Sequence, residues 1–89
     1  MESNGMSELT MKVKVYAPFR TYFDGSAKSV SAVNATGPFD ILPKHKNFIS
    51  LLSPGTLTVR IPERPDFEME IEQALIHVKL DLVTVFLDV

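Results

Sequence analysis

MKVKVY, at residues 11–16, alternates strictly between apolar side chains and lysine or tyrosine. A period of two is typical of a β-strand that turns one face toward a core and the other toward solvent. TLTVRI at residues 56–61 and FEMEIE at residues 67–72 repeat the pattern. Three such segments in a short chain predict a fold built from half-buried strands.

Proline and glycine divide the rest of the chain into further short strands. Pro18 ends the first strand, because proline has no amide hydrogen to donate to a sheet. Asp24-Gly25 is a common hairpin signal and predicts a turn after residues 20–23. Further turns are expected at Thr36-Gly37-Pro38, at Pro43 and at Ser53-Pro54-Gly55. The remaining strands predicted from this punctuation are 28–35, 39–42 and 47–52.

The predicted core follows from the apolar positions. Residues 47–52 carry apolar side chains on both faces, so we expect that strand to be buried on both sides. In the alternating strands only one face should be buried. The expected core residues include Ile49, Leu51, Val59 and Val85.

Residues 75–89 contain no glycine, proline or asparagine. A single strand of that length would span about 50 Å at ~3.3 Å per residue, which is too long for a domain of this size. The segment is also too rich in β-branched residues for a helix. We therefore expect two strands that bend near Lys79-Leu80-Asp81. The apolar face of the second would carry Val83, Val85, Leu87 and Val89.

Eight or nine short strands without a convincing helix predict an all-β protein, either a sandwich or a small barrel. The 89 residues are enough for a single domain. Residues 1–10 are polar and without pattern, so we expect a flexible N-terminal tail before a domain at residues 11–89. No basic and apolar leader and no run of about 18 apolar residues is present, so neither a signal peptide nor direct membrane insertion is expected.

Charge and composition exclude several classes of protein. Nine Lys+Arg and eleven Asp+Glu leave a net charge of −2, whereas a protein that binds nucleic acid or a membrane surface would show a basic excess. The chain has no cysteine, which removes thiolate catalysis and thiolate metal ligands. The balance predicts a neutral surface with no nucleic-acid partner.

Candidate chemical groups are few. His45 and His77 have no metal-site spacing, and His77 falls in an alternating strand where a simple surface position is expected. The glutamates of residues 68–72 would form a row that faces solvent or pairs with Lys12, Lys14 or Arg60. No catalytic or phosphate-binding motif is present. We expect no catalytic, cofactor-binding or metal-binding residue.

Four landmarks at fixed spacing carry a family resemblance: Phe23-Asp24-Gly25, Gly37, Leu42-Pro43-Lys44-His45 and Pro54-Gly55. With them, residues 11–89 resemble the epsilon subunit of F-type rotary ATP synthases. FDILPKH at residues 39–45 is similar to that family's F-x-[IV]-L-P-x-H segment, and VTVFLD at residues 83–88 to its closing strand. The chain departs from the family at Thr36, Asp40, Lys44 and Gln73-Ala74.

The resemblance covers only the family's N-terminal β-sandwich domain, since the C-terminal helical hairpin is absent from this sequence. It implies a two-sheet antiparallel β-sandwich and a non-catalytic subunit of the central stalk. Such a subunit would bind the gamma subunit and the membrane rotor ring, coupling rotation to ATP synthesis. It would lie peripherally at the cytoplasmic face of the energy-transducing membrane. The implied ring contacts are Thr36, Gly37, Pro38, Lys44 and His45.

Two other functions remain open. A stand-alone β-sandwich adaptor could have kept the fold without the ATP synthase, and its partners in co-purification would differ. A small enzyme that uses His45 or the glutamate row is the second alternative.

Overall fold

The computed structural model describes residues 9–87, and every regular element in that range is a β-strand. Residues 1–8 of the expected tail, and Asp88 and Val89 of the expected last strand, lie outside the described residues. The strands are β1 (Met11–Ala17), β2 (Arg20–Ala27), β3 (Ser29–Asn34), β4 (Gly37–Ile41), β5 (Phe48–Leu52), β6 (Gly55–Arg60), β7 (Phe67–Ile71), β8 (Ala74–Lys79) and β9 (Leu82–Leu87).

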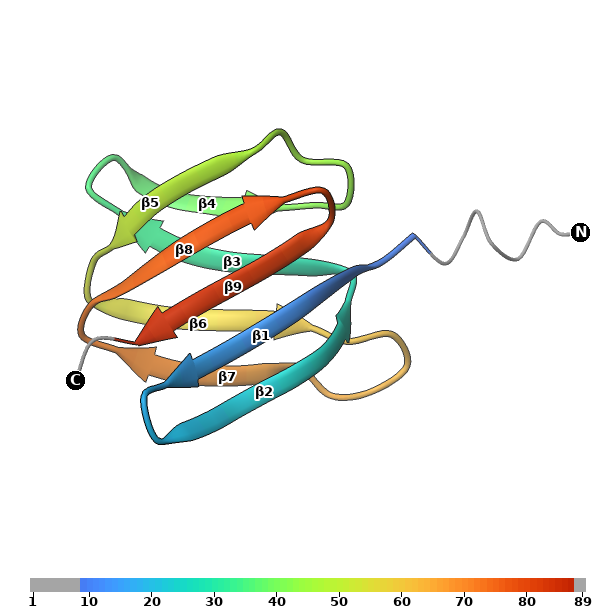
Figure 1. The fold of residues 1–89 in the computed structure, drawn as a ribbon, viewed down its shortest axis with the longest axis horizontal. Helices are drawn as coiled ribbons and strands as arrows, with labels where there is room; N and C mark the ends of the chain where they lie inside the picture. The colour runs from blue at the N-terminus through green and yellow to red at the C-terminus, as the bar shows by residue number, and fades with distance from the viewer. Residues whose placement is uncertain (1–8, 88–89) are drawn as a thin grey trace, which may run out of the picture.

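The strands form two stacked sheets (Figure 1). One has five strands in the order β2-β1-β9-β8-β5, and the other has four in the order β4-β3-β6-β7. All neighbouring strands are antiparallel except β1 and β9, which are parallel. The all-β class and the two-sheet sandwich are therefore confirmed.

The core lies between the two sheets and follows the period of two. In β1 the buried residues are Met11, Val13, Val15 and Ala17. The first three are the apolar residues of the alternating segment 11–16, and Ala17 continues the same face. β8 and β9 bury alternate residues in the same way. Of the predicted core, Val59 and Val85 are fully buried. The fully buried large side chains are Val13, Val15, Val30, Ile41, Leu57, Val59, Ile76, Val78, Val83 and Val85.

The prediction for residues 47–52 is wrong. β5 is the outermost strand of the five-stranded sheet, and Ile49 and Leu51 are 64% and 74% exposed. A strand with two apolar faces is usually central and covered on both sides. Here only the inner face, with Leu52, packs on the core, and no element of the described chain covers the outer face.

The turn predicted at Asp24-Gly25 is also wrong. Both residues lie inside β2, where they pair with Lys14 and Val13 of β1. The turn comes earlier, at residues 18–19, and a bulge between Val15 and Tyr16 adjusts the register. Gly25 does not adopt a positive φ, so it is used as an ordinary strand residue beside the Phe23 ring.

The bend predicted within residues 75–89 is confirmed. β8 and β9 form a tight hairpin whose two turn residues, Leu80 and Asp81, have φ of 50° and 61°. Positive φ at both central residues is the geometry that matches the twist of a two-residue hairpin. The usual residues at these positions are asparagine and glycine, so Leu80 and Asp81 do not form a typical turn sequence.

Candidate functional site

The outer face of the five-stranded sheet carries a row of large apolar side chains across four strands. The register places Tyr16 beside Phe86, Phe86 beside Leu75, and Leu75 beside Leu51. The Tyr16 and Phe86 rings lie 5.3 Å apart. Leu75 and Phe86 are 36% and 37% exposed. These four residues are called the apolar row below.

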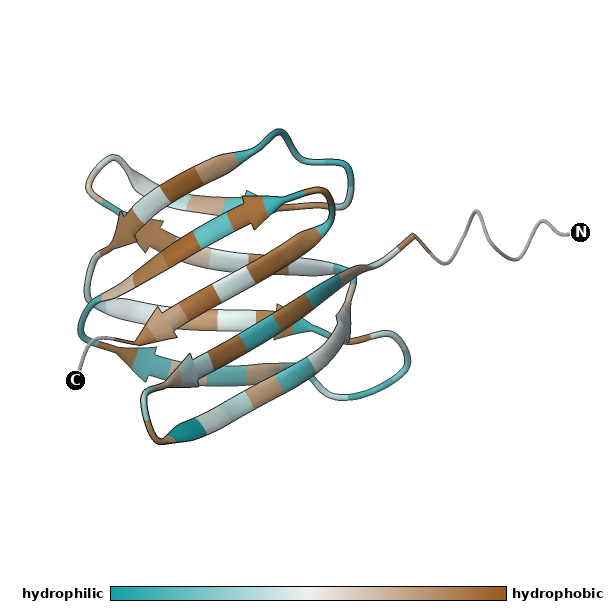
Figure 2. Ribbon diagram, viewed as in Figure 1, coloured by the Kyte–Doolittle hydropathy of each residue, from teal (hydrophilic) through white to brown (hydrophobic). Residues whose placement is uncertain are grey.

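A shallow hollow of about 320 Å³ opens at the β5–β8 end of the apolar row. It is lined mostly by apolar groups. Figure 2 shows that β5, β8 and β9 consist largely of hydrophobic residues. The next row across the sheet is mixed, with Ile49, His77, Thr84 and Lys14 in register. Lysines 12 and 79 flank Leu82 one row further. The face therefore passes from apolar to basic along the strands.

The outer face of the four-stranded sheet has a different character. Hydroxyl groups bind the carboxylates directly: the Ser31 hydroxyl donates to Asp40, and the Thr56 hydroxyl donates to Glu70. Glu68 lies opposite Thr58. These side chains are polar and mostly exposed, so this face is typical of a solvated surface.

The expected position of the glutamate row is confirmed for Glu68 and Glu70, which lie on the solvent side of β7. The expected pairing with Lys12 and Lys14 is wrong, because those lysines belong to the other sheet. Arg60 instead donates to the hydroxyls of Ser29 and Ser31, at 3.3 and 2.7 Å. His77 is an exposed strand-face residue of β8, as predicted.

The residues implied as ring contacts fall into two groups. Thr36, Gly37 and Pro38 form the β3–β4 turn and the start of β4, whereas Lys44 and His45 lie in the loop after β4. Figure 1 shows these two segments at opposite ends of the sandwich, separated by the length of β4. Thr36, Gly37 and Pro38 therefore lie together, and so do Lys44 and His45, but the two groups are far apart.

The β3–β4 turn is braced from both sides. The Asn34 side-chain oxygen accepts hydrogen bonds from the Thr36 amide at 2.9 Å and from the Thr36 hydroxyl at 2.7 Å. Gly37 has φ of 121°, a conformation that side chains disfavour. The Ser53 amide also donates to the Val33 carbonyl at 2.8 Å, which ties this end of β3 to the end of β5. The turn thus lies at the same end of the molecule as the apolar row.

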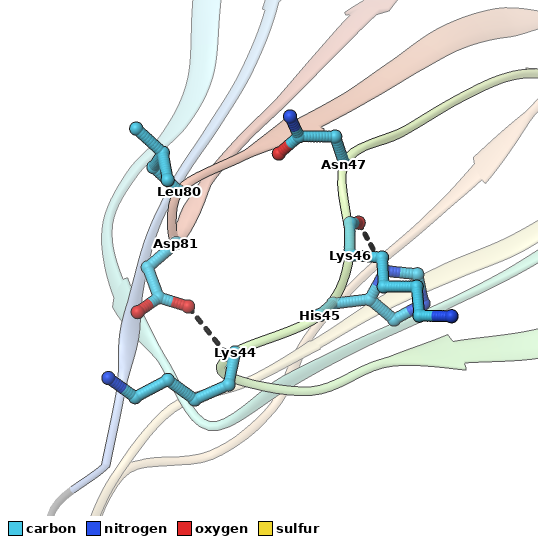
Figure 3. Close-up of a pocket in the computed structure, with 6 residues that line it drawn as sticks. All are labelled: Lys44, His45, Lys46, Asn47, Leu80 and Asp81. Atoms are coloured by element: carbon cyan, nitrogen blue, oxygen red, sulfur yellow. Dashed lines mark hydrogen bonds between the residues drawn. The ribbon is translucent and has the colours of Figure 1, made fainter.

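The β4–β5 loop is held by Asp81 (Figure 3). The Lys44 amide donates to the Asp81 carboxylate at 2.6 Å, and the Lys12 amide donates to the Asp81 carbonyl at 2.9 Å. Asp81 therefore joins the loop, the β8–β9 turn and β1. The His45 ring packs edge-on to Phe48, with centroids 5.6 Å apart. A hollow of about 540 Å³ lies between the loop and the turn.

We expect Asp81→Ala to lower the free energy of unfolding by about 1–2 kcal/mol. The change removes the acceptor for the Lys44 amide. It also places alanine, which tolerates positive φ less well than aspartate does, at a turn position with positive φ. Asp81→Asn is the matched control, since it keeps a side-chain oxygen and tolerates positive φ, and it should lose clearly less. Urea denaturation measures both. Equal losses in the two variants would mean that the side-chain bond does not hold the loop.

Residues 9–87 include few groups that could carry chemistry. No group of three or more His, Cys, Asp or Glu side chains in that range is placed to hold a metal ion. The described part of the chain also has no helix long and apolar enough to cross a membrane. The apolar row is a surface feature that suits contact with another protein.

Comparison with known sequences gives a consistent match. The family described as "ATP synthase, Delta/Epsilon chain, beta-sandwich domain" matches residues 10–89. The ATP synthase epsilon chain of Nitratiruptor sp. is 37% identical over 54 residues, covering 61% of this chain and 42% of that protein. That of Neisseria meningitidis is 30% identical over 80 residues, covering 89% and 57%. The chain therefore spans about half the length of the curated relatives it matches.

Two solved structures share the fold at low sequence identity. One is the cryo-EM structure of the Euglena gracilis mitochondrial ATP synthase, OSCP/F1/c-ring in rotational state 1. The match to it has a TM-score of 0.82 at 15% identity and covers 89% of this chain and 51% of that one. The other is the central stalk and c-ring of the Tetrahymena thermophila mitochondrial ATP synthase, with a TM-score of 0.73 at 19% identity, covering 86% and 62%.

Proposed function

Because the chain belongs to the ATP synthase delta/epsilon β-sandwich family, we propose that it is a non-catalytic central-stalk subunit of an F-type ATP synthase. In this role it binds the gamma subunit and the membrane rotor ring and couples ring rotation to ATP synthesis. It lies peripherally, at the cytoplasmic face of the energy-transducing membrane, and is carried there by its partners. It takes no cofactor.

The apolar row is the observation that supports a stalk role. A free-standing sandwich would gain solubility from polar residues on both outer faces, as on the four-stranded sheet. Here one face instead presents Tyr16, Phe86, Leu75 and Leu51 in register. We assign gamma binding to this face, because aromatic and aliphatic side chains around a shallow hollow are typical of the centre of a protein interface.

Ring contact belongs to one end of the sandwich in this proposal. A flat ring can face either Thr36–Pro38 or Lys44 and His45, since the two groups lie at opposite ends of β4. We assign it to the turn of Thr36, Gly37 and Pro38. That turn is braced, exposes Thr36 and Pro38, and lies at the end where the apolar row would hold the stalk.

Co-purification tests the function itself. A tagged copy of the chain, expressed in its own host, should recover the gamma subunit and ring components of the ATP synthase. Recovery of a different, reproducible partner without those subunits would favour the stand-alone adaptor. The experiment distinguishes a stalk subunit from a stand-alone adaptor, because each should bind a protein partner but the partners differ.

We expect Thr36→Lys combined with Pro38→Lys to weaken association with the ring while leaving the melting temperature nearly unchanged. Both side chains are exposed, so the change removes a contact rather than core packing. Thr36→Lys also removes the hydroxyl bond to Asn34, but that bond is exposed to solvent and the Thr36 amide still donates to Asn34. The matched variant, Lys44→Glu with His45→Ala, changes the opposite end and should leave ring association intact. Quantifying ring subunits that co-purify with each variant gives the comparison. The reverse pattern would move the ring contact to the β4–β5 loop.

A further inference from the structure

The two sheets of the sandwich end in four edge strands, β2, β5, β4 and β7. Exposed edges can pair with strands of other molecules, and proteins commonly guard them with charges, prolines or bulges. Three of these edges are guarded. β2 carries one charged residue at its start and another in its middle, and it pairs with β1 through a bulge. β4 contains a proline and an aspartate, and β7 carries two glutamates. The guarding residues are Arg20, Asp24, Pro38, Asp40, Glu68 and Glu70.

β5 has none of these devices. Its five residues, FISLL, contain no charge, no proline and no glycine. Ile49 and Leu51 project from the outer face and are among the most exposed large apolar residues of the described chain. An uncharged edge with exposed β-branched and aliphatic side chains is a template for strand addition.

The edge is also complementary to itself. If two β5 strands pair antiparallel about a two-fold axis at Ser50, Ile49 of each copy lies opposite Leu51 of the other. Directly opposed apolar pairs stabilise such a ladder. The same operation on β7 would place Glu68 opposite Glu70 and bring like charges together. β5 can therefore pair with a second copy without the like-charge repulsion that β7 would meet.

We propose that this chain forms a two-fold dimer in which the β5 strands of two copies pair antiparallel and join the five-stranded sheets into one. Each apolar row then ends against Ile49 of the other copy, since Leu51 is the last residue of the row. The contact is small, because only five residues of each copy enter the ladder. Interfaces well below about 1,200 Å² are weak, so the dimer forms at high protein concentration. The inference does not rest on the proposed function.

Sedimentation of the purified full chain between about 10 µM and 1 mM tests the dimer, a range that covers dissociation constants typical of weak association. We expect a reversible shift from monomer to dimer. Ile49→Lys should weaken dimerisation at least tenfold, because the register puts the new charge in the centre of the ladder. Phe19→Lys is the matched control. It adds the same charge at a fully exposed aromatic in the β1–β2 turn, and should leave dimerisation unchanged.

Disulfide trapping tests the register. The chain has no cysteine, so Ile49→Cys and Leu51→Cys each introduce a single thiol. Opposed Cα atoms in an antiparallel ladder are about 4.5–5.5 Å apart, within the range that a disulfide spans. Mixing the two variants with diamide, which accepts the two electrons as the thiols lose their protons, should give a mixed disulfide in preference to either homodimer.

Three results would overturn the dimer. The first is a monomer throughout the concentration range. The second is unchanged association in Ile49→Lys; should that variant lose its strand signal in circular dichroism, Leu51→Lys replaces it. The third is association that survives Ile49→Lys but is lost in Phe86→Glu, which would place the contact on the sheet face rather than on the β5 edge.

Discussion

Ile76→Ala should lower the free energy of unfolding by roughly 3–4 kcal/mol, a large part of the 5–15 kcal/mol that stabilises a typical domain. Ile76 is fully buried in β8, between Ser50 of β5 and Val85 of β9. Truncation to alanine removes three buried carbon atoms and leaves a cavity between two sheets that cannot easily close. Urea denaturation at micromolar protein concentration measures the loss.

Ile49→Ala is the control for Ile76→Ala. It makes the same isoleucine-to-alanine change on β5, the strand that pairs with β8. Ile49 is mostly exposed, so its loss should cost less than about 1 kcal/mol. The low protein concentration keeps any association through β5 out of the measurement. Similar losses in the two variants would show that the outer face of β5 is covered in the monomer, contrary to the described structure.

Phe86→Glu should weaken binding to the gamma subunit by about 100-fold, equivalent to roughly 2.7 kcal/mol. Phe86 lies in the middle of the apolar row, against Tyr16 and Leu75. A carboxylate at that point would be buried without a partner on complex formation, whereas in the free domain it would stay hydrated. Titration calorimetry with purified gamma subunit measures the change.

Ser26→Glu is the matched control for charge. Ser26 is exposed on β2 and lies opposite Lys12, at the other end of the same sheet from the apolar row. The Ser26→Glu variant adds the same carboxylate to the same face of the sheet, so it should change the affinity for the gamma subunit little. If both variants weaken binding equally, the net charge of the face would matter and the apolar row would not be the contact.

Most of the fold could be predicted from local signals. The alternation in residues 11–16 identified the buried face of β1, and the length of residues 75–89 required the hairpin at Leu80-Asp81. The errors at Asp24-Gly25 and at residues 47–52 have a common cause. Whether a glycine turns or pairs, and whether an apolar face is covered, is decided by neighbouring strands that are distant in sequence.

The candidate site was less accessible from sequence for the same reason. Leu51, Leu75 and Phe86 each look like ordinary strand residues, and only sheet order puts them in one row with Tyr16. One signal for the apolar row was present in the sequence. Residues 48–52 have apolar side chains on both faces, whereas β5, as an edge strand of a sandwich, buries only its inner face. The resemblance named Thr36 and Lys44 together, but seven residues of turn and strand separate their positions and carry them to opposite ends of β4.

The parallel pairing of β1 with β9 has a mechanical consequence. Five residue pairs, from Lys12–Leu82 to Tyr16–Phe86, join the first and last strands in the middle of the sheet. A force applied between residues 10 and 87 pulls these strands in opposite directions along their own axes. All the hydrogen bonds between them then bear the load together, in shear, whereas an antiparallel hairpin pulled at its open end releases its bonds one after another. The sandwich should therefore resist stretching along this axis far better than peeling at β5, a useful property for any domain that transmits torque.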